Sequence, residues 1–177
     1  LMIDYRGPGE ELLNNGHTIQ VNVAPGSILV LDGRAFNLKQ FHFHAPSEDL
    51  MDGQRYAMEG HLVHADAEGH LAVIAVLYRT GAPDPTLAAL WSAMPETADT
   101  KQPLTAPVDP SRLLPADRDY FRYDGSLTTP PCTEGVRWIV MKEPLTVSPD
   151  QVERFTRVMH GPNNRPVQPL NARLIVR

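Results

Sequence analysis

Hydrophobic residues in this chain recur mainly in short segments with the composition and spacing of β-strands. Each segment is rich in β-branched or aromatic residues and is bounded by turn-forming residues such as Asp32-Gly33 or Gly69. The longest apolar stretch, Leu71–Tyr78, has the length of a buried strand. By these criteria the predicted strands are Thr18–Val23, Ser27–Leu31, Asn37–His44, Ala57–His64, Leu71–Tyr78, Gly135–Met141 and Arg173–Val176.

Two segments instead carry apolar residues at the spacing of a helix. In Asp84–Met94, two leucines and Trp91 fall on one face of a short helix. Ser148–His160 has clearer end signals, because it opens with a Ser-Pro pair and Gln151 completes a capping box. Gly161, followed by proline, predicts its end.

Proline and glycine interrupt the rest of the chain too often for long helices. The sequence holds 17 prolines and 12 glycines in 177 residues, which favours a β-rich fold with extended connections. Ala45–Arg55 is predicted to be a loop, and Gln102–Pro115 is predicted to run extended over the surface. Without repeats or an interdomain linker, residues 1–177 are predicted to form one mostly β (α+β) domain. Its core is expected to be a twisted, largely antiparallel sheet with short surface helices.

Composition and charge exclude several classes of protein. Hydrophobic residues make up 42% and charged residues 21%, values of a globular chain rather than a disordered one. The net charge is −5 and no cluster of Lys and Arg occurs, so nucleic acid is not an expected partner. No apolar run approaches the ~18 residues of a membrane span, so no membrane partner is expected either. The chain opens on a strand-like alternation at Leu1–Tyr5, and we expect it to begin in mid-domain.

Histidines at alternate positions form the most informative pattern. On a strand, Gln40, His42 and His44 share one face, because successive side chains point to opposite faces. Glu59 and His61 have the same spacing on a second predicted strand. If the two strands pair antiparallel, His61 adds a third imidazole to the first two. Three neutral histidines suit zinc and leave a fourth position for water, and Glu59 is placed to accept a ring N–H.

A different metal site is an alternative interpretation of the same residues. His42, His44 and Glu48 match the first half of a cupin motif, in which all three would ligate iron or manganese. The residues around His61 do not match the second half of that motif. His64 and His70 have no comparable context and are interpreted as structural or exposed.

Together, the motifs resemble those of the α-class carbonic anhydrases, and the resemblance covers essentially the whole chain. The segments that carry it, in the family's order and rough spacing, are Asn14–His17, Gln40–His44, Glu59–His64, Gly125–Cys132 and Asn163–Leu170. Pro-Ser-Glu after the histidines and the cysteine after Pro-Pro resemble bacterial rather than animal members. The resemblance implies reversible hydration of carbon dioxide to bicarbonate and a proton, through zinc-bound hydroxide.

Roles follow from the resemblance, position by position. His42, His44 and His61 match the zinc ligands, and Gln40 and Glu59 match the side chains that hold His42 and His61. The partner of His44 would be a backbone carbonyl near Asn163.

The catalytic matches lie elsewhere in the chain. Thr128 matches the threonine that accepts a hydrogen bond from the zinc-bound hydroxide, and Glu48 matches the carboxylate that takes the threonine's hydrogen bond. His17 matches the proton shuttle, for which an imidazole has a suitable pKa. The residues matched to the substrate pocket are Val63, Val73, Leu127, Thr129, Val136 and Trp138.

The sequence also departs from the family. Family members have further residues before the equivalent of Leu1, so this chain is expected to lack an N-terminal segment, and Cys132 to lack the cysteine that pairs with it. Bacterial members are mostly exported, which implies a periplasmic or secreted protein. Carbon dioxide and bicarbonate are the expected small-molecule partners, and a homodimer is left open. A non-catalytic module of the same fold is the remaining alternative, although all three ligand positions hold histidine.

Overall fold

The structure, a computed structural model, describes residues 1–104 and 106–177. Its strands are β1 (Met2–Asp4), β2 (Gly9–Asn14), β3 (Ile19–Val23), β4 (Ile28–Leu31), β5 (Arg34–His44), β6 (Leu50–Met51), β7 (Gln54–Arg55), β8 (Met58–Ala65), β9 (Leu71–Thr80), β10 (Thr100–Val108), β11 (Tyr120–Ser126), β12 (Glu134–Met141) and β13 (Leu145–Val147). Its helices are α1 (Pro85–Ser92), α2 (Pro149–Val158) and the 3₁₀ turn η1 (Pro110–Leu113).

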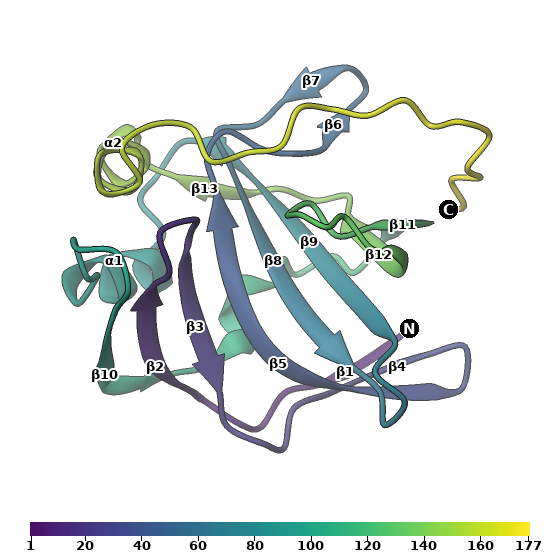
Figure 1. The fold of residues 1–177 in the computed structure, drawn as a ribbon, viewed down its shortest axis with the longest axis horizontal. Coiled ribbons are helices and arrows are strands. Elements are labelled where there is room, and N and C mark those ends of the chain that lie inside the picture. The colour runs from purple at the N-terminus through teal and green to yellow at the C-terminus, as the bar shows by residue number, and fades with distance from the viewer.

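One large twisted sheet dominates the molecule, as predicted (Figure 1). Its strands run in the order β10-β2-β3-β5-β8-β9-β12-β11, with β4 also beside β5, β1 beside β4 and β13 beside β9. Most neighbours are antiparallel, but β9 is parallel to both β12 and β13. The predicted strands up to Met141 are found within a few residues of their expected ends.

The predicted strand Arg173–Val176 is wrong. Only Val176 pairs, in an isolated bridge with Arg122. Asn171 and Ala172 have φ of 48° and 65°, so the chain turns just before the segment. Leu174 is 81% exposed, and the segment therefore has no apolar face to bury against the sheet.

Several elements were not expected from the sequence. The predicted loop Ala45–Arg55 contains the hairpin β6–β7, which turns at Asp52-Gly53 with φ of 51° and 76°, the backbone that an Asp-Gly hairpin turn requires. The predicted extended segment Gln102–Pro115 consists of most of the edge strand β10 and then η1. Strands β2, β11 and β13 have too few alternating apolar residues to be recognised alone.

The central strands separate two kinds of side chain onto the two faces of the sheet. On one face, Phe41 and Phe43 of β5 and Leu62 of β8 belong to the main hydrophobic core. On the other, Val73 of β9 and Trp138 of β12 belong to a smaller apolar cluster. This alternation leaves His42 and His44 of β5 and His61 of β8 on the face of the smaller cluster, while His64 of β8 points to the other face.

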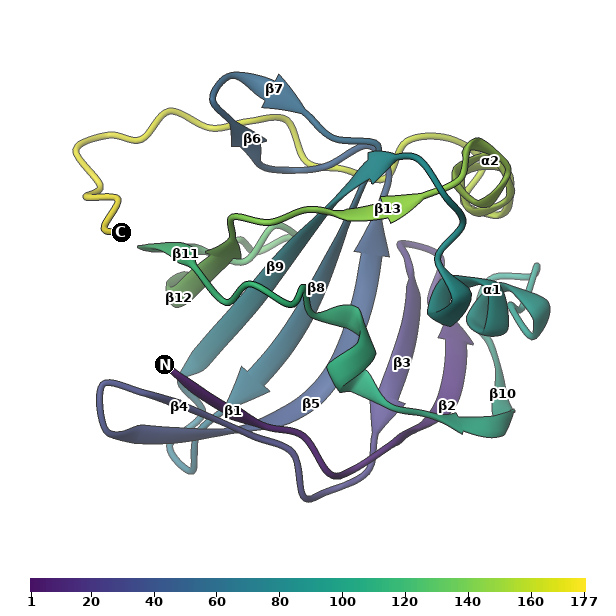
Figure 2. The same cartoon turned by 180° about the vertical axis from the view of Figure 1, so that it is seen from behind.

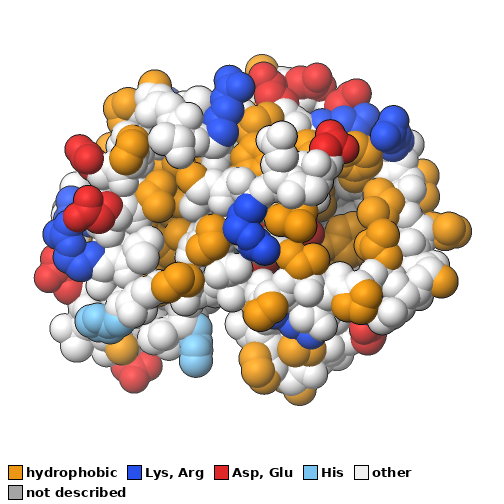
Figure 3. Space-filling view, turned by 90° about the horizontal axis from the view of Figure 1, so that it is seen from above, with side chains coloured by type: hydrophobic (Ala, Val, Ile, Leu, Met, Phe, Trp, Pro, Cys, Tyr) orange, Lys and Arg blue, Asp and Glu red, His pale blue; other side chains and the backbone are white. Residues whose placement is uncertain are grey.

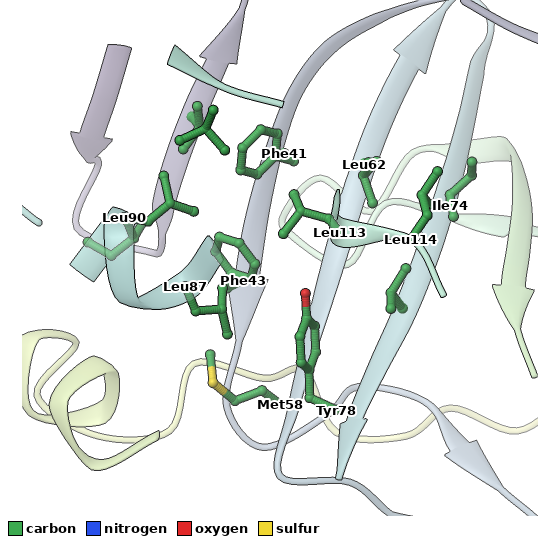
Figure 4. Packing of buried hydrophobic residues seen from close by; sticks show 14 of the residues in the cluster. Phe41, Phe43, Met58, Leu62, Ile74, Tyr78, Leu87, Leu90, Leu113 and Leu114 are labelled. Atoms are coloured by element: carbon green, nitrogen blue, oxygen red, sulfur yellow. The ribbon is translucent and has the colours of Figure 1, made fainter. Parts of the chain in front are cut away.

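The main core is covered by α1 and η1, which lie against the sheet in Figure 2. Figure 4 shows Leu87 and Leu90 of α1 close to Phe43. Both helices begin as predicted: Asp84 caps α1, and Ser148 and Gln151 form the capping box of α2. A side-chain cap of this kind is worth about 1 kcal/mol. Within the part of the chain that is described, neither helix has the length and apolar character needed to cross a membrane.

His64 is structural, as the sequence suggested, and it makes stability depend on pH. Its Nδ1–H donates to the Ala72 carbonyl at 3.2 Å, so Nε2 accepts from the Tyr5 hydroxyl at 2.7 Å. Burial lowers the pKa of His64 to about 4. Below the ordinary histidine pKa of 6.5, His64 therefore binds a proton in the unfolded chain but stays neutral in the folded state.

We expect the neutral, buried His64 to make its full contribution to the free energy of unfolding above pH 6.5. That contribution should be lost as the pH falls toward 4. The loss amounts to about 3 kcal/mol. Urea unfolding at pH 7, 5.5 and 4.5 measures it. His64→Gln, which does not titrate, should be less stable at pH 7 but should show a flatter decline toward acid. Parallel declines for the two proteins would contradict this assignment.

Candidate metal centre

Three histidines from two neighbouring strands converge on the face that carries the smaller apolar cluster. His42 of β5 lies directly opposite His61 of β8 in the antiparallel pair, and His44 follows two residues after His42. Ring centroids are 5.0 Å apart for His42 and His44, 5.3 Å for His42 and His61, and 4.6 Å for His44 and His61. One nitrogen from each ring lies within 4.8 Å of the other two.

Each imidazole is oriented by an acceptor on its outer side. His42 Nδ1–H donates to Gln40 Oε1 at 2.8 Å, and His61 Nε2–H donates to Glu59 Oε1 at 3.1 Å. His44 Nδ1–H donates to the backbone carbonyl of Asn163 at 3.2 Å. Because each ring N–H is used in this way, the unprotonated nitrogens are Nε2 of His42, Nε2 of His44 and Nδ1 of His61.

Electrostatics keep these imidazoles neutral. Burial is the main cause that lowers the pKa of each ring, and repulsion from neighbouring imidazoles lowers the pKa values of His42 and His44 further. The pKa of His44 falls to about 4. Lone pairs are therefore available for a metal at neutral pH without prior loss of protons.

The donor set fits a metal ion such as zinc. His44 Nε2 is buried and has no hydrogen-bond partner among the described residues, and a buried polar atom without a partner is costly. Three neutral imidazoles with outer acceptors are a donor set suited to zinc that leaves one position open. Glu48, the third ligand of the cupin-like alternative, is not part of this group, whose third member is His61.

Besides orienting His61, Glu59 binds the loop that contains Glu48 and Asp49. Its Oε2 accepts the backbone N–H groups of Glu48 and Asp49, at 2.7 and 2.9 Å. Burial raises the pKa of Glu59, while these backbone N–H groups oppose the rise. The carboxylate therefore joins β8 to the loop that follows β5.

Asp49 and Tyr123 were not expected at this site from the sequence. The Tyr123 hydroxyl donates to Asp49 Oδ1 at 3.3 Å, beside Glu59. Burial, and then repulsion from Glu59, raise the pKa of Asp49 to about 8. Asp49 is half-buried and follows Glu48 in a loop, and nothing in its spacing marks it as part of the site.

Glu48 lies next to His44, and its two carboxylate oxygens have different surroundings. Its Oε1 accepts the Arg165 backbone N–H at 2.6 Å and lies 3.4 Å from His44 Nδ1. Its Oε2 is buried and has no partner among the described residues. Thr128 is half-buried in the connection between β11 and β12, and the described residues include no hydrogen bond on its hydroxyl.

An apolar wall stands beside the imidazoles. Five of the residues that the resemblance assigned to the substrate pocket belong to the same cluster, namely Val63, Val73, Leu127, Val136 and Trp138. The Trp138 ring centroid is 4.8 Å from that of His61. Figure 3 shows hydrophobic side chains gathered around a hollow on the face crossed by the C-terminal segment. Thr129, the sixth assigned residue, is exposed and outside the cluster.

His17 lies on an exposed turn between β2 and β3. Asn15 Oδ1 accepts the His17 backbone N–H at 2.9 Å, and the His17 carbonyl accepts from Asn163 Nδ2 at 3.0 Å. The turn is thus tied to the segment whose backbone carbonyl orients His44.

A second group of side chains that could hold a metal ion lies near the surface, with Glu68 and His70 exposed and Asp66 half-buried. Asp66, Glu68 and His70 lie between β8 and β9, and the Arg34 guanidinium donates to Asp66 Oδ2 at 3.0 Å. The Arg34 guanidinium, which also lies 3.8 Å from Glu68, offsets part of the negative charge of the two carboxylates.

Comparison with known proteins gives consistent results. A family model described as eukaryotic-type carbonic anhydrase matches residues 2–177. The chain is 48% identical to a carbonic anhydrase of Pectobacterium carotovorum over 176 residues, which is 99% of this chain and 72% of that protein.

Solved structures of carbonic anhydrases are also similar to this chain, both in sequence and in fold. The α-carbonic anhydrase of Thermovibrio ammonificans in complex with sulfanilamide has a TM-score of 0.96 and 51% identity, over 99% of this chain and 77% of that one. Carbonic anhydrase Cah3 of Chlamydomonas reinhardtii in complex with acetazolamide has a TM-score of 0.92 and 40% identity, over 98% of this chain and 79% of that one.

Proposed function

This chain belongs to the eukaryotic-type carbonic anhydrase family, and from that premise we propose that it catalyses the zinc-dependent, reversible hydration of carbon dioxide to bicarbonate and a proton. The observation that carries the proposal is the convergence of three neutral imidazoles within 4.8 Å, beside an apolar wall.

His42, His44 and His61 would hold the zinc ion through the nitrogens that their outer partners leave free. When bound, zinc acts as a Lewis acid and lowers the pKa of a coordinated water to about 7, a value established for carbonic anhydrase itself. Gln40, Glu59 and the Asn163 carbonyl keep the rings in the tautomers that this binding needs.

The apolar wall suits the substrate. Carbon dioxide has no net dipole, so binding it requires exclusion of water rather than a set of hydrogen bonds. Val73 and Val136 of the wall are 1% and 2% exposed, and their aliphatic side chains offer water no hydrogen bond. The buried indole of Trp138 extends this wall to His61.

Thr128 and Glu48 are proposed to orient the attacking oxygen. If the Thr128 hydroxyl donates to the buried Glu48 Oε2, its own oxygen is left to accept a hydrogen bond from the nucleophile. Support comes from Glu48 Oε2, a buried acceptor that still lacks a donor, and from the Arg165 backbone N–H that fixes the other oxygen. A lone pair of the nucleophile would then face the substrate carbon.

His17 is proposed to carry the product proton to the solvent. His17→Ala should lower kcat by about 10-fold or more in dilute buffer, because a positioned acid–base group typically contributes 10²–10⁴-fold. Added imidazole should restore the rate, since it replaces the missing carrier. His70→Ala, at an exposed site away from the histidine cluster, is the control. An H17A rate equal to that of the wild type at every buffer concentration would exclude the role.

Stopped-flow hydration of carbon dioxide by the zinc-loaded chain tests the proposal as a whole. We expect rapid hydration that acetazolamide abolishes, as the sulfonamide-bound relatives suggest. A folded, zinc-loaded chain with no hydration above background would contradict the proposal and favour the non-catalytic module.

A further inference from the structure

Asn163 joins several parts of the site at once. It lies in the segment after α2, which passes over the ends of the central strands (Figures 1 and 2). Its side chain accepts the Ala45 backbone N–H at Oδ1, at 2.9 Å. Through Nδ2 it donates to the carbonyls of Phe43 and His17, both at 3.0 Å.

The Asn163 backbone adds two more contacts to the same region. Its carbonyl accepts from His44 Nδ1 at 3.2 Å, and its N–H donates to the Ala45 carbonyl at 3.2 Å. Residue 163 is therefore fixed against the end of β5, on both sides of the ligand His44. A carboxamide is the group that can accept one backbone N–H and donate to two carbonyls from a short side chain.

Apart from the bond to Asn163, the tip of the His17 turn has few contacts with the rest of the molecule. Gly16, with φ of 79°, and His17 are both exposed. The Asn15 side chain bonds within the turn, and Thr18 bonds Phe43 at the base of the turn. In the described part of the chain, the bond from Asn163 Nδ2 is the one that joins His17 itself to a distant residue.

We propose that the Asn163 side chain is a positioning residue for proton transfer, which holds the His17 backbone at a fixed place relative to His44. The inference rests on the proposed role of His17 as proton carrier. Its physical basis is that proton transfer between two groups is efficient only over a narrow range of separations. A turn that moves freely would keep His17 within that range for less of the time.

Asn163→Asp tests the two donated bonds most selectively. The carboxylate retains the acceptor for Ala45 but has no hydrogen to donate to His17 or Phe43. Asn164→Asp is the matched control, because it makes the same change one residue later, where the side chain donates, among the described residues, to the Arg165 carbonyl alone, at 3.5 Å. Asn163→Ala, which adds no charge, is measured in parallel in case the carboxylate prevents folding.

In stopped-flow assays, N163D should lower kcat in dilute buffer by about 10-fold, a part of what a positioned acid–base group contributes. Imidazole should restore it, and N163D should add nothing in the H17A background. A loss of kcat/KM or of zinc affinity that imidazole does not repair would overturn the proposal, because it would place the effect at His44.

Amide hydrogen exchange separates this inference from the proposed function, because it needs no activity. N163D should raise the exchange of the amides of residues 15–18 by about 10-fold through local opening, and N164D should not. Unchanged exchange in an active N163D protein overturns the positioning role alone. A zinc-loaded wild type that does not hydrate carbon dioxide overturns the proposed function, and the catalytic part of this inference with it.

Discussion

His61→Ala should yield a folded chain that no longer retains zinc and hydrates carbon dioxide only at the uncatalysed rate. His61 supplies one of the three nitrogens. It lies on β8, which pairs with β5, the strand that carries His42 and His44. With two imidazoles left, zinc affinity should fall by more than the ~10–100-fold typical of losing an outer hydrogen-bond partner. Metal analysis after dialysis and stopped-flow hydration measure the two effects.

The chain offers a matched control on the same strand. His64 is also buried, but it points to the opposite face and bonds Tyr5 and Ala72. His64→Ala should lower the melting temperature and keep both zinc and activity. If H61A retained zinc in the amount found for the wild type, the three-histidine site would be wrong.

Glu59→Gln should have the second largest effect. The carboxylate accepts three N–H groups, from His61, Glu48 and Asp49. An amide has one acceptor oxygen, so its NH₂ group must face at least one of these donors. We expect zinc affinity to fall by about 10–100-fold, because the His61 ring loses the partner that fixes its tautomer.

Glu68→Gln makes the same chemical change at an exposed position and should alter nothing measurable. Zinc competition against a chromophoric chelator gives the affinities, and thermal unfolding of the metal-free proteins gives the cost to the fold. Equal zinc affinity for E59Q and the wild type would show that Glu59 serves the loop alone.

Alternation of side chains along strands made much of the fold predictable. The spacing of Phe41 and Phe43 against His42 and His44 predicted which residues of β5 enter the core and which face the site, and the structure confirms this division. Antiparallel pairing of β5 with β8 then brings His61 opposite His42. These features depend on residues that lie close together in the sequence, so the pattern of a short segment is enough to predict them.

Features that depend on distant contacts were not predictable in the same way. Tyr123 reaches Asp49 across 74 positions of sequence, and Asn163 reaches His17 across 146. No periodicity connects such pairs, and the family resemblance pointed only to the backbone near Asn163. The predicted strand at Arg173–Val176 failed for the complementary reason: its composition suits a strand, but the sheet offers it one bridging residue.

X-ray absorption spectroscopy on the wild-type protein, after metal analysis, tests the assignment of the site most directly. We predict one zinc ion per chain, with a spectrum dominated by three imidazole nitrogens at about 2.0–2.1 Å. Iron or manganese bound with a carboxylate ligand would contradict the three-histidine zinc site and support the cupin-like alternative. A chain that retained no metal at all would equally contradict it.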